Sequence, residues 1–172
     1  MLARIFSGTV VGLEGTLVEI EVDLVKRGFP TFTIVGLPGK AVEESRERVK
    51  SALLNSSSHF PNHRLTVNLA PADLPKQGPA FDLPIAVGIL LSSEQIPLHE
   101  IFNDSLFLGE LSLDGSLRPI AGVLPITMMA RERGYARIFV PKGNVDEAAV
   151  VDGIDVYSLD SLSDLIKVIR QI

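Results

Sequence analysis

The sequence predicts a single mixed α+β domain over residues 1–172. Its composition, 46% hydrophobic and 22% charged, is typical of one globular domain with a sizeable core. The first third alternates apolar and polar residues with the period of two that half-buried strands show. The second half alternates short apolar strands with helical segments. We therefore expect an antiparallel N-terminal meander followed by β-α-β-α units with parallel strands.

Strand-like segments at residues 5–11, 17–24 and 31–35 open the chain, with short glycine-containing breaks between them. Parallel neighbours would need crossovers of a dozen residues or more, so consecutive antiparallel pairing is the prediction. The period then changes. Residues 41–54 place apolar side chains on one face and charged ones on the rest, which predicts an amphipathic helix.

Residues 64–69 form the next predicted strand, which leads through a proline-rich loop into a helix over residues 83–92. Because this helix is apolar on every side, we expect it to be buried between layers as the central helix. Asp82 is the predicted N-cap, and Pro84 stands in the first turn, where its missing N–H costs nothing.

The remaining elements alternate in type. A predicted strand at residues 106–113 turns at Asp114-Gly115, a typical hairpin dipeptide. The later predicted elements are a helix at 123–133, a strand at 137–141, a short helix at 145–150, a strand at 155–158 and a helix at 162–169.

Charge and composition exclude several classes of protein. The net charge of −5 makes this chain alone a poor candidate for holding nucleic acid, because phosphate binding needs a basic surface. The longest apolar run, residues 85–91, is far shorter than the ~20 residues of a membrane span. With no cysteine and no secretion signal, we expect a soluble cytoplasmic protein with no membrane partner.

Two motifs that suggest ligands have simpler interpretations. Residues 36–40 (GLPGK) invite comparison with a phosphate-binding loop, but only two residues separate the glycines and Ala41 follows the lysine. His59 and His63 have the spacing of helical metal ligands, yet Pro61 lies between them and no third ligand is in view. We interpret both histidines, like His99, as exposed loop residues and expect no metal site.

Carboxylates provide the other candidates for chemistry. Asp73, Asp82, Glu110 and Asp114 could form a pair for acid–base work, but nothing in the sequence fixes their separation. Asp82 is better explained as a helix cap and Asp114 as a turn residue. Glu110 follows a glycine within a strand, so we consider a specific buried or interface contact for it.

The most informative segment is the strand-to-helix turn between residues 68 and 91. Such a turn presents side chains and free backbone N–H groups together, where a fold can place a nucleophile beside an anion-stabilising site. The residue at the presenting position is Ala80. Alanine has no lone pair for attack and no proton to lose, so the segment favours a non-catalytic role.

Three long motifs carry a family resemblance. They are residues 36–53 (GLPGKAVEESRERVKSAL), 66–86 (TVNLAPADLPKQGPAFDLPIA) and 109–125 (GELSLDGSLRPIAGVLP). Over nearly the whole chain the sequence resembles the N-terminal domain of the YifB/ComM family, bacterial magnesium-chelatase-like AAA+ ATPases. The resemblance implies a fold similar to the Lon proteolytic domain, in the ribosomal protein S5 domain 2-like group, and to the C-terminal domain of RadA.

The resemblance also identifies two degenerate positions. Lon-type proteases use a serine after Gly-Pro and a lysine base, and the matching positions here are Ala80 and Leu124. Nucleophile and base are both replaced by apolar residues, so no peptide hydrolysis is expected. The candidate interface or structural residues around this loop are Lys76, Gly78, Asp82, Glu110 and Arg118.

The same resemblance implies an AAA+ module that this chain lacks. That module would bind ATP and Mg²⁺, form hexameric rings and drive branch migration of DNA in natural transformation. The expected partners are this AAA+ domain, neighbouring subunits and, in the ring, DNA. For the chain itself, the resemblance implies a non-catalytic domain without a cofactor that supports ring assembly or DNA coupling.

Two alternatives stay open. One is a serine hydrolase with a relocated dyad, in which Ser92, Ser93 or Ser112 pairs with Lys76; the other is a protein-interaction module that recruits a recombination factor. Four basic residues could also meet DNA in the ring: Arg46, Arg48, Lys50 and Lys76. For the first three of these, a solvated helix face is the simpler interpretation.

Overall fold

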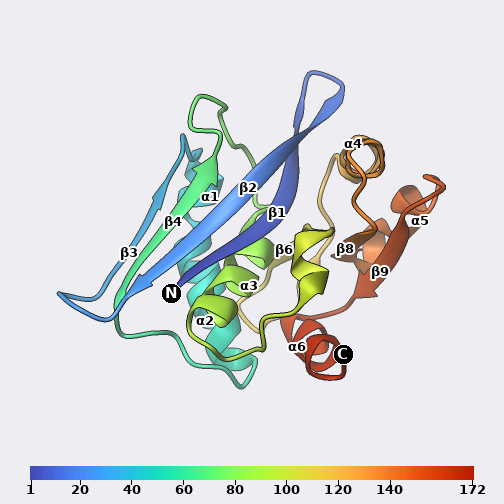
Figure 1. Cartoon of the computed structure of the whole chain (residues 1–172). Coiled ribbons are helices and arrows are strands. Elements are labelled where there is room, and N and C mark those ends of the chain that lie inside the picture. The colour runs from blue at the N-terminus through green and yellow to red at the C-terminus, as the bar shows by residue number, and fades with distance from the viewer.

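A seven-stranded sheet in the order β3-β4-β2-β1-β5-β8-β9 runs through the computed structural model, which describes residues 1–172 (Figure 1). Its strands are β1 (Leu2–Val11), β2 (Glu14–Val25), β3 (Thr31–Val35), β4 (Arg64–Ala70), β5 (Ser105–Phe107), β8 (Arg137–Pro141) and β9 (Asp155–Leu159). A separate antiparallel ribbon pairs β6 (Glu110–Leu111) with β7 (Leu117–Arg118).

Six α-helices and two short 3-10 helices accompany the strands, the last helix following the final strand. They are α1 (Lys40–Glu43), α2 (Ser45–Asn55), α3 (Asp82–Ser92), η1 (Glu100–Asn103), α4 (Val123–Glu132), η2 (Lys142–Asn144), α5 (Val145–Ala148) and α6 (Leu162–Arg170). No helix of the chain combines the length and the apolar character that crossing a membrane requires.

The predicted N-terminal meander is wrong at its third strand. β1 and β2 form the expected antiparallel hairpin, but β4 pairs antiparallel with β2 and parallel with β3, which becomes the edge strand. Two strand spacings amount to only about 10 Å, and the connection at residues 26–30 is long enough to cross them. β3, the helices α1 and α2, and β4 therefore form a βαβ unit.

The predicted parallel arrangement of the second half is confirmed. β5 pairs parallel with β8, and β8 pairs parallel with β9. α4 precedes β8 and α5 precedes β9, so helices provide both crossovers. The hairpin at Asp114-Gly115 is also confirmed, because β6 and β7 pair on either side of it.

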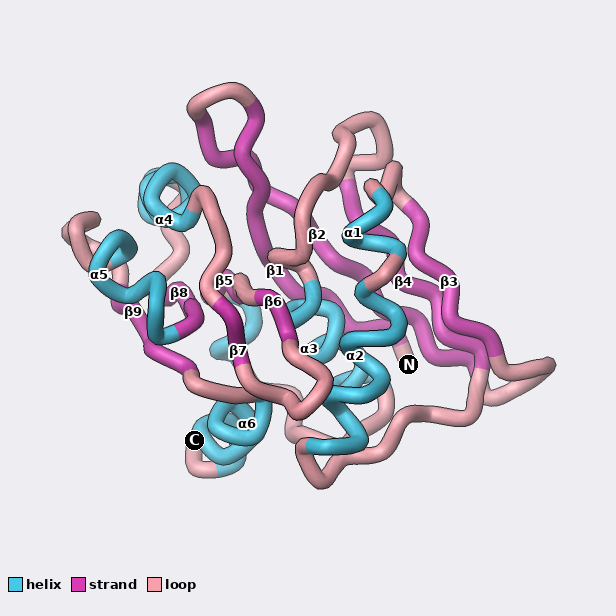
Figure 2. Tube along the Cα trace, turned by 180° about the vertical axis from the view of Figure 1, so that it is seen from behind, coloured by secondary structure: helices cyan, strands magenta, loops and turns pink.

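Helices cover both faces of the sheet around β8, next to the edge strand β9. Phe139 belongs to the larger core with α3 and α6, whereas its neighbours Ile138 and Val140 belong to the smaller core under α4 and α5. Toward β3, α1 and α2 lie along one face, as Figure 2 shows from behind. All residues of α3 are buried, so the prediction of a central helix is confirmed.

Two predicted elements are interrupted. The helix expected at 41–54 divides into α1 and α2 at Glu44. The strand expected at 106–113 ends at Phe107 and resumes at Glu110. Between them, Gly109 donates its N–H to the Ala80 carbonyl (3.0 Å) and accepts from the Leu83 N–H (3.1 Å), which fixes this segment against the start of α3.

Candidate functional site

The loop at residues 71–81, between β4 and α3, is anchored by a buried lysine. Lys76 is fully buried, and its Nζ donates to the Pro71 carbonyl. Its backbone N–H donates to Leu37 (3.1 Å), and its carbonyl accepts from the Gly39 N–H (2.8 Å). Desolvation lowers the pKa of the Lys76 amine. The lysine therefore joins two loops and is not presented to a ligand.

Asp82 lies in the first turn of α3 and not at its N-cap, which is Phe81, so the predicted cap is wrong. Its buried carboxylate accepts from Arg48 Nε (2.6 Å), Arg48 Nη2 (3.0 Å), the Leu111 N–H (3.1 Å) and the Ser45 hydroxyl. Burial raises the pKa of Asp82, and the hydrogen bonds from Arg48 and Ser45 oppose that shift.

The interpretation of Arg48 as part of a solvated face is therefore wrong. Its side chain is 19% exposed and faces Asp82, and the hydrogen bond to Asp82 raises the pKa of its guanidinium. Arg48 Nη2 also donates to the Ala41 carbonyl at 2.7 Å. The pair joins α2, α3 and β6 behind the loop, so it holds the strand-to-helix turn in shape.

A cavity of about 650 Å³ opens in front of this turn. Four parts of the chain line it: residues 8–10, 12 and 13 of the β1–β2 hairpin, residues 77–80 of the loop, Glu110, and residues 119–122, 125 and 126 around the start of α4. Gly78 and Ala80 of the loop thus meet Glu110, which is distant in sequence, at one cavity. Glu110 forms no ion pair and is the only charged residue in the lining.

The chemistry of this lining is poor in nucleophiles and bases. It contains one hydroxyl, from Thr9, one carboxylate, from Glu110, and one side-chain amide, from Gln77, but no lysine, histidine or serine. A hydroxyl needs a base within hydrogen-bond reach to attack a carbonyl, and the lining offers Thr9 no hydrogen-bonded partner of that kind. Leu124 is absent from the lining and packs against the smaller core.

The serines proposed for a relocated dyad lie elsewhere. Ser92 and Ser93 donate to the Ile89 carbonyl at the C-terminal end of α3 (3.1 and 2.6 Å). Ser112 Oγ accepts a hydrogen bond from Nε of the exposed residue Arg118 at 2.7 Å, which gives Arg118 a structural role. None of the three is hydrogen bonded to Lys76, whose amine donates to a backbone carbonyl.

His59, His99 and the short glycine loop also have structural roles. His99 Nδ1 accepts from the Ile101 N–H (3.2 Å) and caps η1, and the backbone of His59 bonds with the Gln95 amide. No three His, Cys, Asp or Glu residues are placed to hold a metal ion. The 36–40 loop holds Lys76, and its composition does not fit ATP or Mg²⁺.

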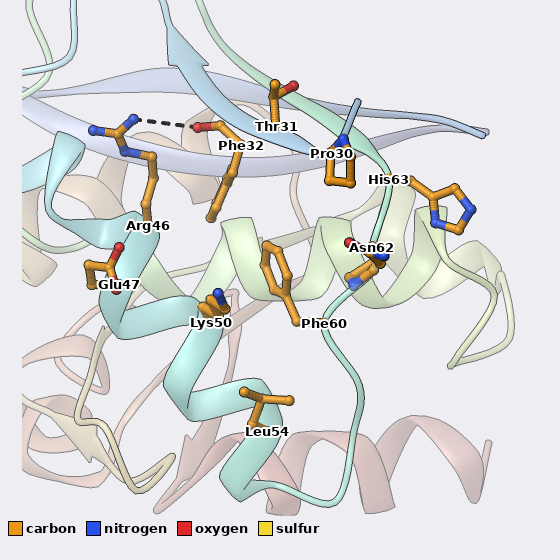
Figure 3. A pocket seen from close by; sticks show the side chains of 11 residues that line it. Pro30, Thr31, Phe32, Arg46, Glu47, Lys50, Leu54, Phe60, Asn62 and His63 are labelled. Atoms are coloured by element: carbon orange, nitrogen blue, oxygen red, sulfur yellow. Dashed lines mark hydrogen bonds between the residues drawn. The ribbon is translucent and has the colours of Figure 1, made fainter. Parts of the chain in front are cut away.

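A second hollow, of about 580 Å³, lies between the start of β3 and α2 (Figure 3). Arg46 reaches from α2 to the Phe32 carbonyl (Nη1 to O, 3.4 Å), and the rings of Phe32 and Phe60 are 5.4 Å apart. The Lys50 amine lies 5.7 Å from the centre of the Phe60 ring. Sequence pattern does not indicate this site, because its parts come from three separate segments of the chain.

The fold and the first cavity define an α/β domain built around a strand-to-helix turn that presents no nucleophile. The family described as "Subunit ChlI of Mg-chelatase" matches residues 20–144, and the chain belongs to this family. The resemblance to the YifB/ComM family is confirmed by relatives with these names, at 40% and 43% identity.

The chain is 43% identical over 166 residues to "Competence protein ComM" of Haemophilus influenzae, covering 96% of this chain and 32% of the relative. It is 40% identical over 152 residues to "Uncharacterized protein YifB" of Escherichia coli, covering 88% and 29%. Similarity to "Lon protease 2" of Bacillus subtilis is weaker, 25% over 168 residues, covering 88% and 30%. The chain thus spans about one third of the length of these relatives.

Proposed function

We propose that this chain is a non-catalytic, Lon-like domain of a cytoplasmic ComM/YifB-type AAA+ ATPase. The observation that supports it most directly is the cavity at Ala80, whose lining contains no lysine, histidine or serine. A fold that keeps an active-site turn but has apolar residues at positions 80 and 124 is suited to binding or support.

In the whole protein, the domain supports assembly of a hexameric ring or couples the ring to DNA during branch migration in natural transformation. The ATP and Mg²⁺ sites belong to the AAA+ module, in the two thirds of the relatives that this chain does not span. The domain's partners are that module, the neighbouring subunits and DNA, with no membrane involved.

The absence of chemistry is tested on the isolated chain. We expect no turnover of ATP, of branched DNA or of casein, and no labelling by a serine-reactive phosphonate. Casein cleavage that persists through purification, or labelling of one serine per chain, would instead support a hydrolase with a relocated nucleophile.

The supporting role is tested by deleting residues 1–172 from the full-length ComM/YifB-type protein. We expect weaker ring assembly or weaker branch migration, with basal ATP hydrolysis retained. Native mass spectrometry measures the ring, and a synthetic four-way junction measures branch migration. If both are unchanged, the domain has neither role.

A protein-interaction module is the second candidate, and the β1–β2 hairpin favours it. The hairpin projects beyond the other elements (Figure 1), and its tip residue Leu13 is 93% exposed at the rim of the cavity. Recruitment of a recombination factor through this tip would make Leu13→Asp abolish capture of that factor while ring assembly stays normal. Normal capture by the variant would exclude the tip as the docking site.

A further inference from the structure

One end of the molecule gathers cationic side chains that have no acidic partner. Five of the 16 lysines and arginines lie there, all exposed and none in an ion pair. We call this set the basic end: Lys26, Arg27, Arg46, Lys50 and Arg64. The pairing of Arg64 with both Val25 and Thr31 brings the start of β4 beside the β2–β3 connection.

The second hollow lies within the basic end. Its lining includes Arg46 and Lys50 against a single acidic residue, Glu47, which leaves one net positive charge. Lys26 and Arg27, in the β2–β3 connection that leads to the lining residues Pro30 and Thr31, and Arg64, at the start of β4, add three more positive charges nearby. A chain with a net charge of −5 thus has a local surface of the opposite sign, which attracts anions.

Aromatic side chains accompany these cations. Phe29 follows Lys26 and Arg27 in the β2–β3 connection and is 90% exposed. Phe32 and Phe60 are partly buried in the wall of the hollow, with Lys50 above the Phe60 ring (Figure 3). Cations that neutralise phosphates, together with aromatic rings on which bases stack, are the usual components of single-strand binding sites.

We propose that the basic end binds single-stranded nucleic acid, with phosphates at Lys26, Arg27 and Lys50 and an unpaired base against Phe29. The bases of a duplex are stacked within it and offer no free face to Phe29, so the exposed ring favours a single strand. The inference rests on the proposed function, because it specifies where the DNA-coupling domain holds DNA.

The test is fluorescence anisotropy of the 172-residue chain with a 5′-fluorescein-labelled 20-nucleotide oligothymidylate. We expect saturable binding at low salt that weakens as salt rises, with a slope of about 0.7 for each phosphate contact. An unlabelled duplex of the same length is expected to compete at least about tenfold less well. Equal competition by the duplex would exclude single-strand selectivity.

Three variants separate the charges from the ring. Lys26→Glu with Arg27→Glu is expected to lower affinity at least about tenfold and to reduce the salt slope, because two phosphate contacts are lost. Phe29→Ala is expected to lower affinity about tenfold without changing the slope, because stacking is not ionic. Arg131→Glu with Arg133→Glu, at the C-terminal end of α4, makes the same charge change elsewhere and is expected to bind like the unmodified chain.

The proposal is overturned if the chain does not bind at low salt, or if the α4 variant loses as much affinity as the Lys26/Arg27 variant. After either of these results, the proposed function still stands if deletion of residues 1–172 from the full-length ComM/YifB-type protein impairs ring assembly or branch migration. If the deletion has no effect while the chain binds oligothymidylate, the proposed function fails and the binding site remains.

Discussion

Asp82 and Arg48 form the one buried ion pair that joins three elements behind the turn. The Asp82 carboxylate has no exposed surface, so its charge depends on the hydrogen bonds it accepts from Arg48, Ser45 and Leu111. Removing one partner from such a pair leaves an uncompensated charge, which is costlier than replacing both. Arg48→Met is therefore expected to lower the free energy of unfolding by about 3 kcal/mol, measured by urea denaturation.

Two comparisons isolate this effect. Arg46→Met, on the same helix but exposed, is expected to change the free energy of unfolding by no more than about 0.5 kcal/mol. Arg48→Met combined with Asp82→Asn is expected to be more stable than Arg48→Met alone, because the unpaired carboxylate is gone. Equal losses for Arg46→Met and Arg48→Met would show that the pair does not hold the turn.

The sequence identified Asp82 as important but assigned it the wrong role. An acidic residue two positions before Pro84 fits both an N-cap and a first-turn carboxylate, and local pattern does not distinguish them. The partner that decides the matter, Arg48, is 34 residues away. Ala80 shows the opposite case, because the chemistry of one side chain was enough to predict that its position has no nucleophile.

Because the Lys76 amine is buried, we expect the free energy of unfolding to depend on pH. Desolvation lowers the pKa of its amine in the folded chain, so the unfolded chain binds more protons between that value and 10.5. The free energy of unfolding therefore rises with pH across this window, as the cost of burying the ammonium disappears. Relative to Lys76→Met, the unmodified chain should become progressively more stable as the pH rises from the lowered pKa toward 10.5.

Urea denaturation at several pH values measures that difference. Lys40→Met, at the exposed lysine that begins α1, is the control, because this side chain is not buried in the folded chain. A constant difference between the unmodified chain and Lys76→Met would mean that the amine is not desolvated.

At the scale of elements, α3 lies unusually close to β2. A Cβ added at Gly88 would lie 2.4 Å from Val22 Cγ2, so any larger residue must push the helix off the sheet. Alanine is a better helix former than glycine by about 1 kcal/mol, yet overpacking in a core costs about 1–3 kcal/mol. We expect Gly88→Ala to lower the free energy of unfolding by about 1 to 2 kcal/mol.

Val22→Ala supplies the control for this prediction. It removes the methyl group that the new Cβ would meet, so the double variant should lose less stability than the two single losses added together. Thermal unfolding followed by circular dichroism gives all three values. Stabilisation by Gly88→Ala alone would show that the helix can move away from β2 at little cost.

Element type was predictable from periodicity, but the position of β3 was not. Alternation at residues 31–35 correctly indicated a strand, and the all-apolar run in α3 correctly indicated a buried helix. The order of strands depends on hydrogen bonds between β2, β3 and β4, and the short connection at 26–30 fits either neighbour. The cavity at Ala80 was missed for a similar reason, since the β1–β2 hairpin and the start of α4 meet only in the folded chain.

At the scale of the whole molecule, the two cores and the projecting segments predict a gradient of local stability. α3 is enclosed by the sheet, α2 and α6, whereas the hairpin tip at 11–14 and the connection at 26–30 are exposed. Amides open locally where few apolar contacts hold them. We expect hydrogen exchange to be slowest in α3 and in the paired segments of β1, β2 and β4, and fastest at those two exposed segments.

Repeating the hydrogen-exchange measurement with oligothymidylate tests where the chain binds nucleic acid. If the basic end binds a single strand, hydrogen exchange should slow at residues 26–31 and 60–64. It should stay unchanged at the hairpin tip, although the tip and the connection at 26–30 both exchange quickly in the free chain. The hairpin tip is thus an internal control for general effects of the polyanion. Equal slowing at both places would indicate non-specific binding, while slowing at the tip alone would move the nucleic-acid site to the cavity at Ala80.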